Sequence, residues 1–204
     1  MGRYPDVSLA IIAGGRGSRL SGVPTGLLVR QGRTGLSRLL ELSSLTADIF
    51  LVANDAAPYA TYEVKSVPDV VEGRGAPGGV HTALVYARTE WVLAVGCDMP
   101  FVSSEVAELV LSSRAEGVDI VAFEIDGRLE PLLAAYRKAL APAWGSALEA
   151  SPSFARLFRS FRTRLLPEQA LRTVDPDMRA VVSINTPTDV ARFAIELPAS
   201  GSAP

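Results

Sequence analysis

The chain has very few of the side chains that build disulfides, zinc centres and histidine-based catalytic sites. Among its 204 residues there is one cysteine, Cys97, and one histidine, His81. A single cysteine cannot form an intramolecular disulfide, which fits a reducing cytosol. The scarcity also argues against a zinc centre or a Ser-His-Asp triad, because the partners are missing. We expect Cys97 to be a small buried apolar residue and His81 to pack within a helix or lie on its surface.

Long apolar runs and an excess of one charge sign are also missing. No run approaches the ~20 apolar residues that cross a bilayer, and no basic-then-apolar signal segment opens the chain. The 20 Lys and Arg residues nearly balance the 22 Asp and Glu residues, for a formal net charge of −2. Such a balance does not favour nucleic-acid binding. We therefore predict a cytoplasmic protein with neither a membrane nor a nucleic acid as partner.

Two familiar phosphate-binding motifs are absent as well. A P-loop requires a Gly-Lys pair, and the chain contains no such pair. The dinucleotide fingerprint G-x-G-x-x-G fails in residues 15–20, which read GRGSRL and lack the last glycine. A phosphate site in this chain must therefore have another form.

What the sequence does contain near its start is an apolar run that ends in two glycines. Residues 7–13 have the length and composition of a buried strand, and Gly14 and Gly15 follow. Glycines after a strand let backbone N–H groups approach a ligand closely. Residues 1–40 hold six arginines but only one acid, Asp6. Focused positive charge predicts a phosphate ligand here, the alternative being an ordinary strand-to-helix turn.

Apolar strand-like runs alternate with helical patterns along most of the chain, which predicts βαβ units. We expect an α/β fold with three Rossmann-like layers: a mostly parallel sheet with helices on both faces. The strands expected are 7–13, 49–53, 64–67, 91–97, 119–123 and 181–184, with 132–136 as an antiparallel strand. The helices expected are 36–45, 80–88, one that begins at 103–105, 154–161 and a last one opened by 186–189. One domain would cover residues 1–197, followed by a flexible tail over 198–204.

The expected helix 154–161 lies within a row of arginines. They are Arg156, Arg159, Arg162 and Arg164, and apolar residues at helical spacing lie between them. This pattern is typical of an amphipathic helix whose arginines face water. The alternative is a basic wall that faces a phosphate-bearing second substrate.

Glycines or polar residues that could contact a ligand follow four of the expected strands. Gly14 and Gly15 follow the first, and Asn54, Asp69 and Asp98 follow the next three. Ligands of open α/β sheets bind at the carboxyl ends of the strands, so these residues could line one crevice. Asp98 comes after a continuous apolar strand and could hold Mg²⁺ against phosphates, or it could cap a turn. Asp69 follows Pro68 and is open to the same turn interpretation.

Several short blocks, taken in order, resemble the molybdenum cofactor guanylyltransferases, a branch of the sugar-nucleotide-type nucleotidyltransferases. The blocks are Ile12-Ala13-Gly14-Gly15, Arg19, Gly26-Leu27-Leu28, Val52-Ala53-Asn54, Val67-Pro68-Asp69, Gly75-Ala76-Pro77-Gly78-Gly79, Cys97-Asp98-Met99-Pro100 and Asn185-Thr186-Pro187. They are scattered over residues 7–195. No single block is decisive, but their order and spacing are fairly specific.

The resemblance implies a nucleotidyltransferase-type fold and a reaction. The phosphate of molybdopterin would attack the α-phosphorus of GTP and release pyrophosphate, with Mg²⁺ and cationic side chains stabilising the phosphate charge. GTP and the molybdenum cofactor would be the small-molecule substrates. Molybdoenzymes or cofactor-delivery proteins would be the candidate protein partners.

The resemblance also implies roles for individual residues. Asp98 would hold the metal and act in catalysis together with Arg19. The nucleotide would lie against Ile12, Ala13, Gly14, Gly15, Thr25, Asn54 and Asp69. Asn185 would lie towards the pterin, with Glu130 across from it. The double glycine resembles the guanylyl-transferring branch, since the cytidylyl-transferring branch has alanine at the position of Gly14.

The chain departs from the family pattern at two positions. Thr25 stands where the family carries a lysine, and Val52 stands where a polar residue faces the nucleotide. Loss of a lysine aimed at the triphosphate weakens transition-state stabilisation unless Arg16, Arg30 or Arg33 replaces it. Two alternatives therefore stay open. One is a non-catalytic relative that binds nucleotide or cofactor, and the other is a nucleotidyltransferase with a different acceptor, such as a sugar phosphate.

Overall fold

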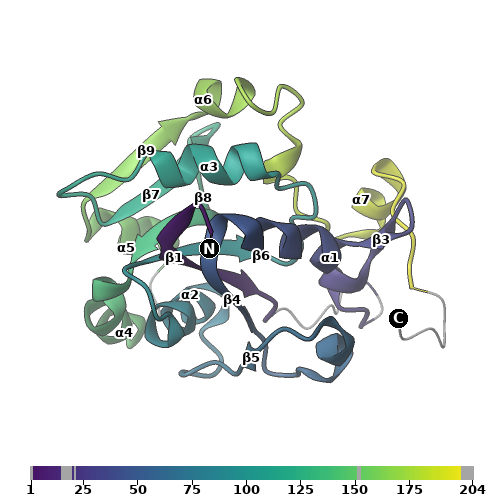
Figure 1. Cartoon of the computed structure of the whole chain (residues 1–204), viewed down its shortest axis with the longest axis horizontal. Coiled ribbons are helices and arrows are strands. Elements are labelled where there is room, and N and C mark those ends of the chain that lie inside the picture. The colour runs from purple at the N-terminus through teal and green to yellow at the C-terminus, as the bar shows by residue number, and fades with distance from the viewer. Residues whose placement is uncertain (1, 15–19, 21, 151–152, 199–204) are drawn as a thin grey trace.

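The computed structural model describes residues 2–14, 20, 22–150 and 153–198. Its described residues form a seven-stranded sheet with the order β5-β4-β1-β6-β8-β7-β9 (Figure 1). The strands are β1 Tyr4–Ile12, β4 Thr46–Val52, β5 Ser66–Val67, β6 Trp91–Gly96, β7 Ile120–Ile125, β8 Arg128–Arg137 and β9 Thr163–Pro167. Two short strands, β2 Val29–Arg30 and β3 Arg33–Thr34, pair with each other apart from this sheet.

The sheet is mostly parallel. β1 pairs in parallel with β4 and β6, β4 pairs in parallel with β5, and β9 pairs in parallel with β7. β8 is antiparallel to both of its neighbours, β6 and β7. The antiparallel strand expected at 132–136 is therefore confirmed, and it is longer at both ends.

Helices cover both faces of the sheet (Figure 1). The α-helices are α1 Gly35–Leu39, α2 Gly75–Tyr86, α3 Ser104–Ser112, α4 Ala141–Leu148, α5 Phe154–Arg159, α6 Glu168–Arg172 and α7 Pro187–Arg192. The 3-10 helices are η2 Thr25–Leu27, η3 Leu40–Leu45, η4 Ala57–Tyr62, η5 Lys138–Leu140 and η6 Arg179–Val181. No helix among the described residues is long and apolar enough to cross a membrane.

Alternate residues of β1 point into two separate hydrophobic cores, as the period of two in a strand requires. Leu9 and Ile11 belong to the core that contains residues of α1 and α3. Ala10 and Ile12 belong to the core that contains residues of α2 and α4. These two cores on opposite faces of the sheet confirm the three-layer α/β fold.

The prediction of a strand at residues 181–184 is wrong. Val181 ends η6, and the next four residues have no regular structure. Ile184 is buried in a small third core with Leu20, Leu28 and Ile195. Val182 packs against the same small core, whereas Val181 packs against the larger core of α1 and α3. The apolar run therefore reflects burial against these cores and not membership of the sheet.

Two helix predictions need correction as well. The expected helix 36–45 divides into α1 and the 3-10 helix η3. The expected helix 80–88 begins earlier, at Gly75, so that residues 75–79 are the first part of α2. A Cβ atom on Gly79 would lie 2.7 Å from Ile12 Cγ2, so this glycine allows close packing of α2 on β1. The sequence also gave no sign of the edge strand β9.

Candidate functional site

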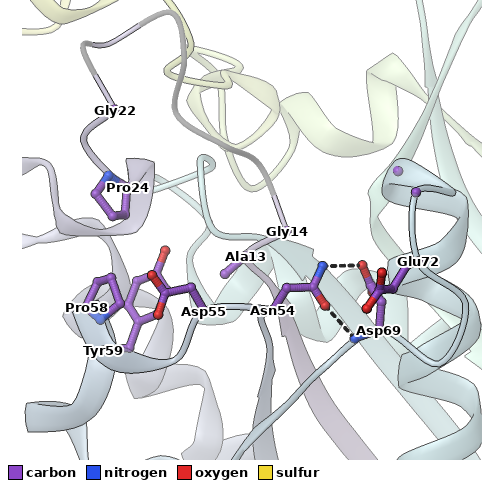
Figure 2. A pocket seen from close by; sticks show the side chains of 12 residues that line it. Ala13, Gly14, Gly22, Pro24, Asn54, Asp55, Pro58, Tyr59, Asp69 and Glu72 are labelled. Carbon is purple, nitrogen blue, oxygen red and sulfur yellow. Dashed lines mark hydrogen bonds between the residues drawn. The ribbon is translucent and has the colours of Figure 1, made fainter.

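A cavity of about 990 Å³ lies at the carboxyl ends of β1, β4 and β5 (Figure 2). Its described lining residues are Ala13, Gly14, Gly22, Pro24, Asn54, Asp55, Pro58, Tyr59, Asp69, Glu72, Gly73 and Gly75. Parallel strands end at the same edge of a sheet, which is why residues so far apart in sequence meet here. The cavity therefore contains the tips of three of the four strands that the sequence had pointed to.

Asn54 and Asp69 hold each other in place across this cavity. Asn54 Nδ2 donates to Asp69 Oδ2 at 2.9 Å, and the backbone N–H of Asp69 donates to Asn54 Oδ1 at 2.8 Å. Thr82 Oγ1, from α2, lies 3.4 Å from Asp69 Oδ1 and also accepts a hydrogen bond from Val70 N. These contacts fix the Asp69 carboxylate before any ligand binds. Sequence reasoning missed Thr82, because nothing local marks a threonine inside a helix as a partner of a strand tip.

Ala13 and Gly14 continue from β1 into the cavity. The backbone N–H of Ala13 donates to Val52 O at 2.8 Å, which extends the pairing with β4. Among the described residues, a Cβ atom on Gly14 would meet only Asp69 Oδ2, at 4.0 Å, so within that part of the chain Gly14 leaves open space beside the carboxylate. The Ile12 side chain packs in the core against Gly79 and does not line the cavity. Gly15 and Arg19, and with them Arg16, lie outside the described residues.

Asp98 and Asn185 form a second polar pair at the tip of β6. Asn185 Nδ2 donates to Asp98 Oδ2 at 3.0 Å, and Ile184 N donates to Asp98 O at 2.8 Å. Asn185 precedes α7, whose start is fixed by a capping box between Thr186 and Asp189. Burial raises the pKa of Asp98, and the hydrogen bond from Asn185 opposes that shift. The sequence proposed both residues for the site, and the structure brings them into direct contact.

Glu130 on β8 is electrostatically coupled to this pair. Its pKa is raised to about 7, because burial disfavours the carboxylate and the negative charge of Asp98 adds to that effect. The sequence had assigned Glu130 only to the acceptor side of the site. The influence of Asp98 on Glu130 follows from the antiparallel β8 lying next to β6.

The residues around Asp98 can accommodate a magnesium ion. Within the described residues no group of three or more His, Cys, Asp and Glu side chains could hold a metal, so there is no complete protein cage. Mg²⁺ commonly binds through one or two carboxylates and takes its other ligands from water and substrate phosphates. Two partly buried carboxyl groups, Asp98 and Glu130, of which the first raises the pKa of the second, fit this pattern.

Thr25, at the position where the resemblance leads us to expect a lysine, is turned towards the core. Its Oγ1 lies 3.3 Å from the Sγ atom of Cys97. Cys97 is buried as expected, and burial raises the pKa of its thiol to about 12. Thr25 is not among the described lining residues of the cavity, whereas its neighbour Pro24 is. The other departure, Val52, is fully buried in the core and does not face the cavity.

Two arginines that could replace the lysine have contacts elsewhere. Arg30 Nε donates to the backbone oxygen of Phe193 at 3.1 Å, and its guanidinium lies over the ring of Phe101. Arg33 forms an ion pair with Glu41, with 2.7 Å between Nη2 and Oε1. Neither arginine lines the cavity. The described lining residues include the acids Asp55, Asp69 and Glu72 and no basic side chain.

The arginine row of the last third follows the amphipathic pattern. On α5, Leu157 and Phe158 are buried while Arg156 and Arg159 are exposed. Arg162 pairs with Asp119 at 2.8 Å, and Arg164 Nη1 donates to Ser113 O at 2.8 Å. None of the four arginines lines the cavity at the strand tips.

Comparison with known proteins agrees with this geometry. Residues 9–174 match the family described as the MobA-like NTP transferase domain. The chain belongs to this family. A molybdenum cofactor guanylyltransferase of Desulfosudis oleivorans is 28% identical over 184 residues, covering 89% of this chain and 91% of the relative. A probable molybdenum cofactor guanylyltransferase of Flavobacterium johnsoniae is 32% identical over 142 residues, covering 69% of this chain and 73% of that relative.

A solved structure supports the same assignment within the MobA-like family. Molybdopterin-guanine dinucleotide biosynthesis protein A from Archaeoglobus fulgidus superposes with a TM-score of 0.78 at 26% identity. The match covers 91% of this chain and 96% of that protein. The family resemblance carried by the scattered sequence blocks is therefore confirmed, and this chain is a nucleotidyltransferase-family protein.

Proposed function

We propose that the protein transfers a guanylyl group from GTP to the phosphate of molybdopterin and releases pyrophosphate. The observation that carries the proposal is the position of two polar pairs on either side of β1. Asn54 and Asp69 line the cavity beyond β4 and β5, and Asp98 and Asn185 lie at the tip of β6. A nucleotide laid across β1 would have its nucleoside at the first pair and its phosphates near the second. The names of the relatives support the choice of GTP and of the molybdenum cofactor.

The nucleoside half of the site would depend on rigid acceptors. Asp69 is already oriented by Asn54, so little side-chain entropy is lost when it accepts a hydrogen bond from the ligand. Gly14 leaves room beside it for a purine. The Gly15 and Arg19 contacts with the phosphates, carried over from the family, stay predictions.

The reaction half of the site would position charge. No covalent enzyme intermediate is required, so catalysis rests on alignment and on neutralisation of the phosphates. Asp98 and Glu130 would hold Mg²⁺, which when bound supplies positive charge against the phosphate oxygens. Asn185 keeps the Asp98 carboxylate in one orientation. The product would pass to molybdoenzymes or to delivery proteins in the cytoplasm.

The test is release of pyrophosphate from GTP in the presence of Mg²⁺ and a verified preparation of molybdopterin. We expect stoichiometric pyrophosphate and a guanine dinucleotide product, with GTP preferred over CTP and ATP. Asp98→Asn serves as the control for enzyme-dependent turnover. Equal or faster reaction with CTP would overturn the guanine assignment.

One observation favours a second candidate, a non-catalytic relative that binds the same nucleotide. Thr25 is hydrogen-bonded to buried Cys97, and no basic residue is found among the described lining residues. Such a protein would bind GTP in calorimetry and release no pyrophosphate with any pterin or sugar phosphate acceptor. The same assay therefore separates the two candidates.

A further inference from the structure

The loop between β5 and α2 presents a carboxylate, Glu72, to the cavity (Figure 2). No described residue donates a hydrogen bond to it and no described cation pairs with it, in contrast to Asp69, which is held by Asn54. A carboxylate in a ligand cavity with both oxygens available is suited to accept hydrogen bonds from the ligand itself. Glu72 lies outside the blocks that carried the family resemblance.

Asp55, a further carboxylate that lines the cavity, has a structural role. Its Oδ1 accepts a hydrogen bond from Ala57 N at 3.0 Å, at the start of η4. Figure 2 shows Asp55 with Pro58 and Tyr59 on one side of Asn54, and Asp69 with Glu72 on the other. The two acids therefore border different ends of the cavity.

Three glycines, Gly14, Gly73 and Gly75, lie among the lining residues at the end of the cavity near Glu72. Of the described atoms, only Asp69 Oδ2 lies within reach of the missing Cβ of Gly14, at 4.0 Å. Gly73 and Gly75 follow Glu72 with φ values of +72° and +58°, and no atom of the described part of the chain lies within 4 Å of their missing Cβ atoms. A planar group can approach the backbone closely at such positions, because no side chain intervenes.

We propose that Glu72 determines base specificity by accepting hydrogen bonds from N1–H and the N2 amine of guanine. The inference rests on the proposed function, since it concerns the nucleotide of that same site. Guanine presents these two donors side by side, and a carboxylate offers two acceptors at matching separation. Adenine and cytosine present a ring-nitrogen acceptor beside their amine, so one carboxylate oxygen would face a lone pair. Desolvated acceptors facing each other are strongly disfavoured.

The experiment compares GTP with ITP, which lacks only the N2 amine, and with ATP. Dissociation constants are measured by calorimetry with Mg²⁺ for the natural protein, Glu72→Gln and the matched control Asp55→Asn. We expect the natural protein to bind GTP about tenfold more tightly than ITP, the effect of one charge-assisted hydrogen bond. Glu72→Gln should weaken GTP binding about tenfold and bring the ratio of the GTP and ITP dissociation constants close to one. Asp55→Asn should leave that ratio unchanged.

The outcomes separate failure of this inference from failure of the proposed function. Glu72 does not determine base specificity if Glu72→Gln keeps the ratio of GTP to ITP affinity of the natural protein. The same follows if Asp55→Asn abolishes the difference between the two affinities. The natural protein would still release pyrophosphate from GTP in that case. If the natural protein binds no nucleotide, the proposed function fails and this inference fails with it. Unchanged melting temperatures of both variants show that the comparison concerns folded protein.

Discussion

In the half of the sheet formed by β5, β4, β1 and β6 every neighbouring pair of strands is parallel, whereas β8 in the other half is antiparallel to both its neighbours. Polar residues of the parallel half gather at the strand tips and bond to one another, as Asn54 does with Asp69. Charged residues of the other half join structural elements. Asp119, just before β7, pairs with Arg162, and Arg137 on β8 pairs with Glu90.

The contrast shows that strand direction decides what a polar residue can do. Parallel strands all end at one edge, so residues that follow them accumulate around a shared cavity. An antiparallel neighbour sends its own carboxyl end to the opposite edge. Acid and amide side chains that follow the parallel strands are therefore available to a ligand. In the other half, Glu130 reaches the same edge from the start of the antiparallel β8, while Asp119 and Arg137 serve stability. The following predictions test that division, from the largest expected effect to the smallest.

The largest effect is expected from Asp98→Asn, in the parallel half. The substitution keeps the shape but removes the charge proposed to hold Mg²⁺, so turnover should fall about 10²-fold or more. The melting temperature should stay within a few degrees, because Asn185 retains a polar partner. Pyrophosphate release and thermal unfolding are the measurements. Near-normal turnover would show that Asp98 is only a turn residue and does not hold the metal.

Gly145→Ala should affect stability strongly and the chemistry little. A Cβ at Gly145 would lie 2.6 Å from Nε2 of His81, which is buried on α2. Overpacking of this kind costs about 1–3 kcal/mol, which is about 2–12 °C in melting temperature for a chain of this size. Adding His81→Ala should restore part of the loss by removing the imidazole. A variant as stable as the natural protein would show that α4 moves freely relative to α2.

Thr25→Lys should raise kcat about tenfold if the natural protein is a slow enzyme. An ammonium forms charge-assisted bonds to phosphate that strengthen as charge develops on the leaving pyrophosphate. The gain should exceed any tightening of GTP binding, since the interaction grows in the transition state. The measurement is steady-state pyrophosphate release, with Thr25→Val, which keeps the shape but removes the hydroxyl, as the control for loss of the Cys97 contact. No gain, or a loss, would indicate that another cation already occupies the position.

The smallest effect is expected from Asp119→Asn in the second half. The Arg162 guanidinium holds the pKa of Asp119 below its usual range. The folded pKa is lower than the unfolded one, so the ionised group stabilises above about pH 4 and this contribution is lost as pH falls through the folded pKa. The variant should melt a few degrees lower at pH 7, and the difference should shrink in acid. Turnover should be unchanged, in contrast to Asp98→Asn, and a fall in turnover would contradict the division between the halves.

Local patterns in the sequence determined the elements and their caps. The apolar run that ends at Gly14 is β1, and the Ser103 and Thr186 starts of α3 and α7 follow from side chains that accept nearby backbone N–H groups. These features depend on residues within a few positions of one another. Short motifs in order along the chain also sufficed for the family.

Where local patterns were ambiguous, the sequence misled. The glycines at 75–79 are typical of a turn, but these residues begin α2, and Gly79 allows the helix to pack on Ile12. The apolar residues 181–184 are typical of a strand, but Val182 and Ile184 pack into a small separate core instead. Composition alone does not say which surface an apolar or small residue meets, and that choice is made by the packing of distant elements.

Only the tertiary structure decided which side chains meet. Asp98 and Asn185 are far apart in the chain, and their contact depends on Ile184 bonding to the backbone of Asp98. The rise in the pKa of Glu130 depends on β8 lying next to β6. The Thr25 side chain points towards Cys97 and away from the cavity, and this orientation depends on how η2 packs at the tip of β6. Strand order and helix packing set these contacts, because they fix which distant segments are neighbours, and no local pattern of residues encodes that.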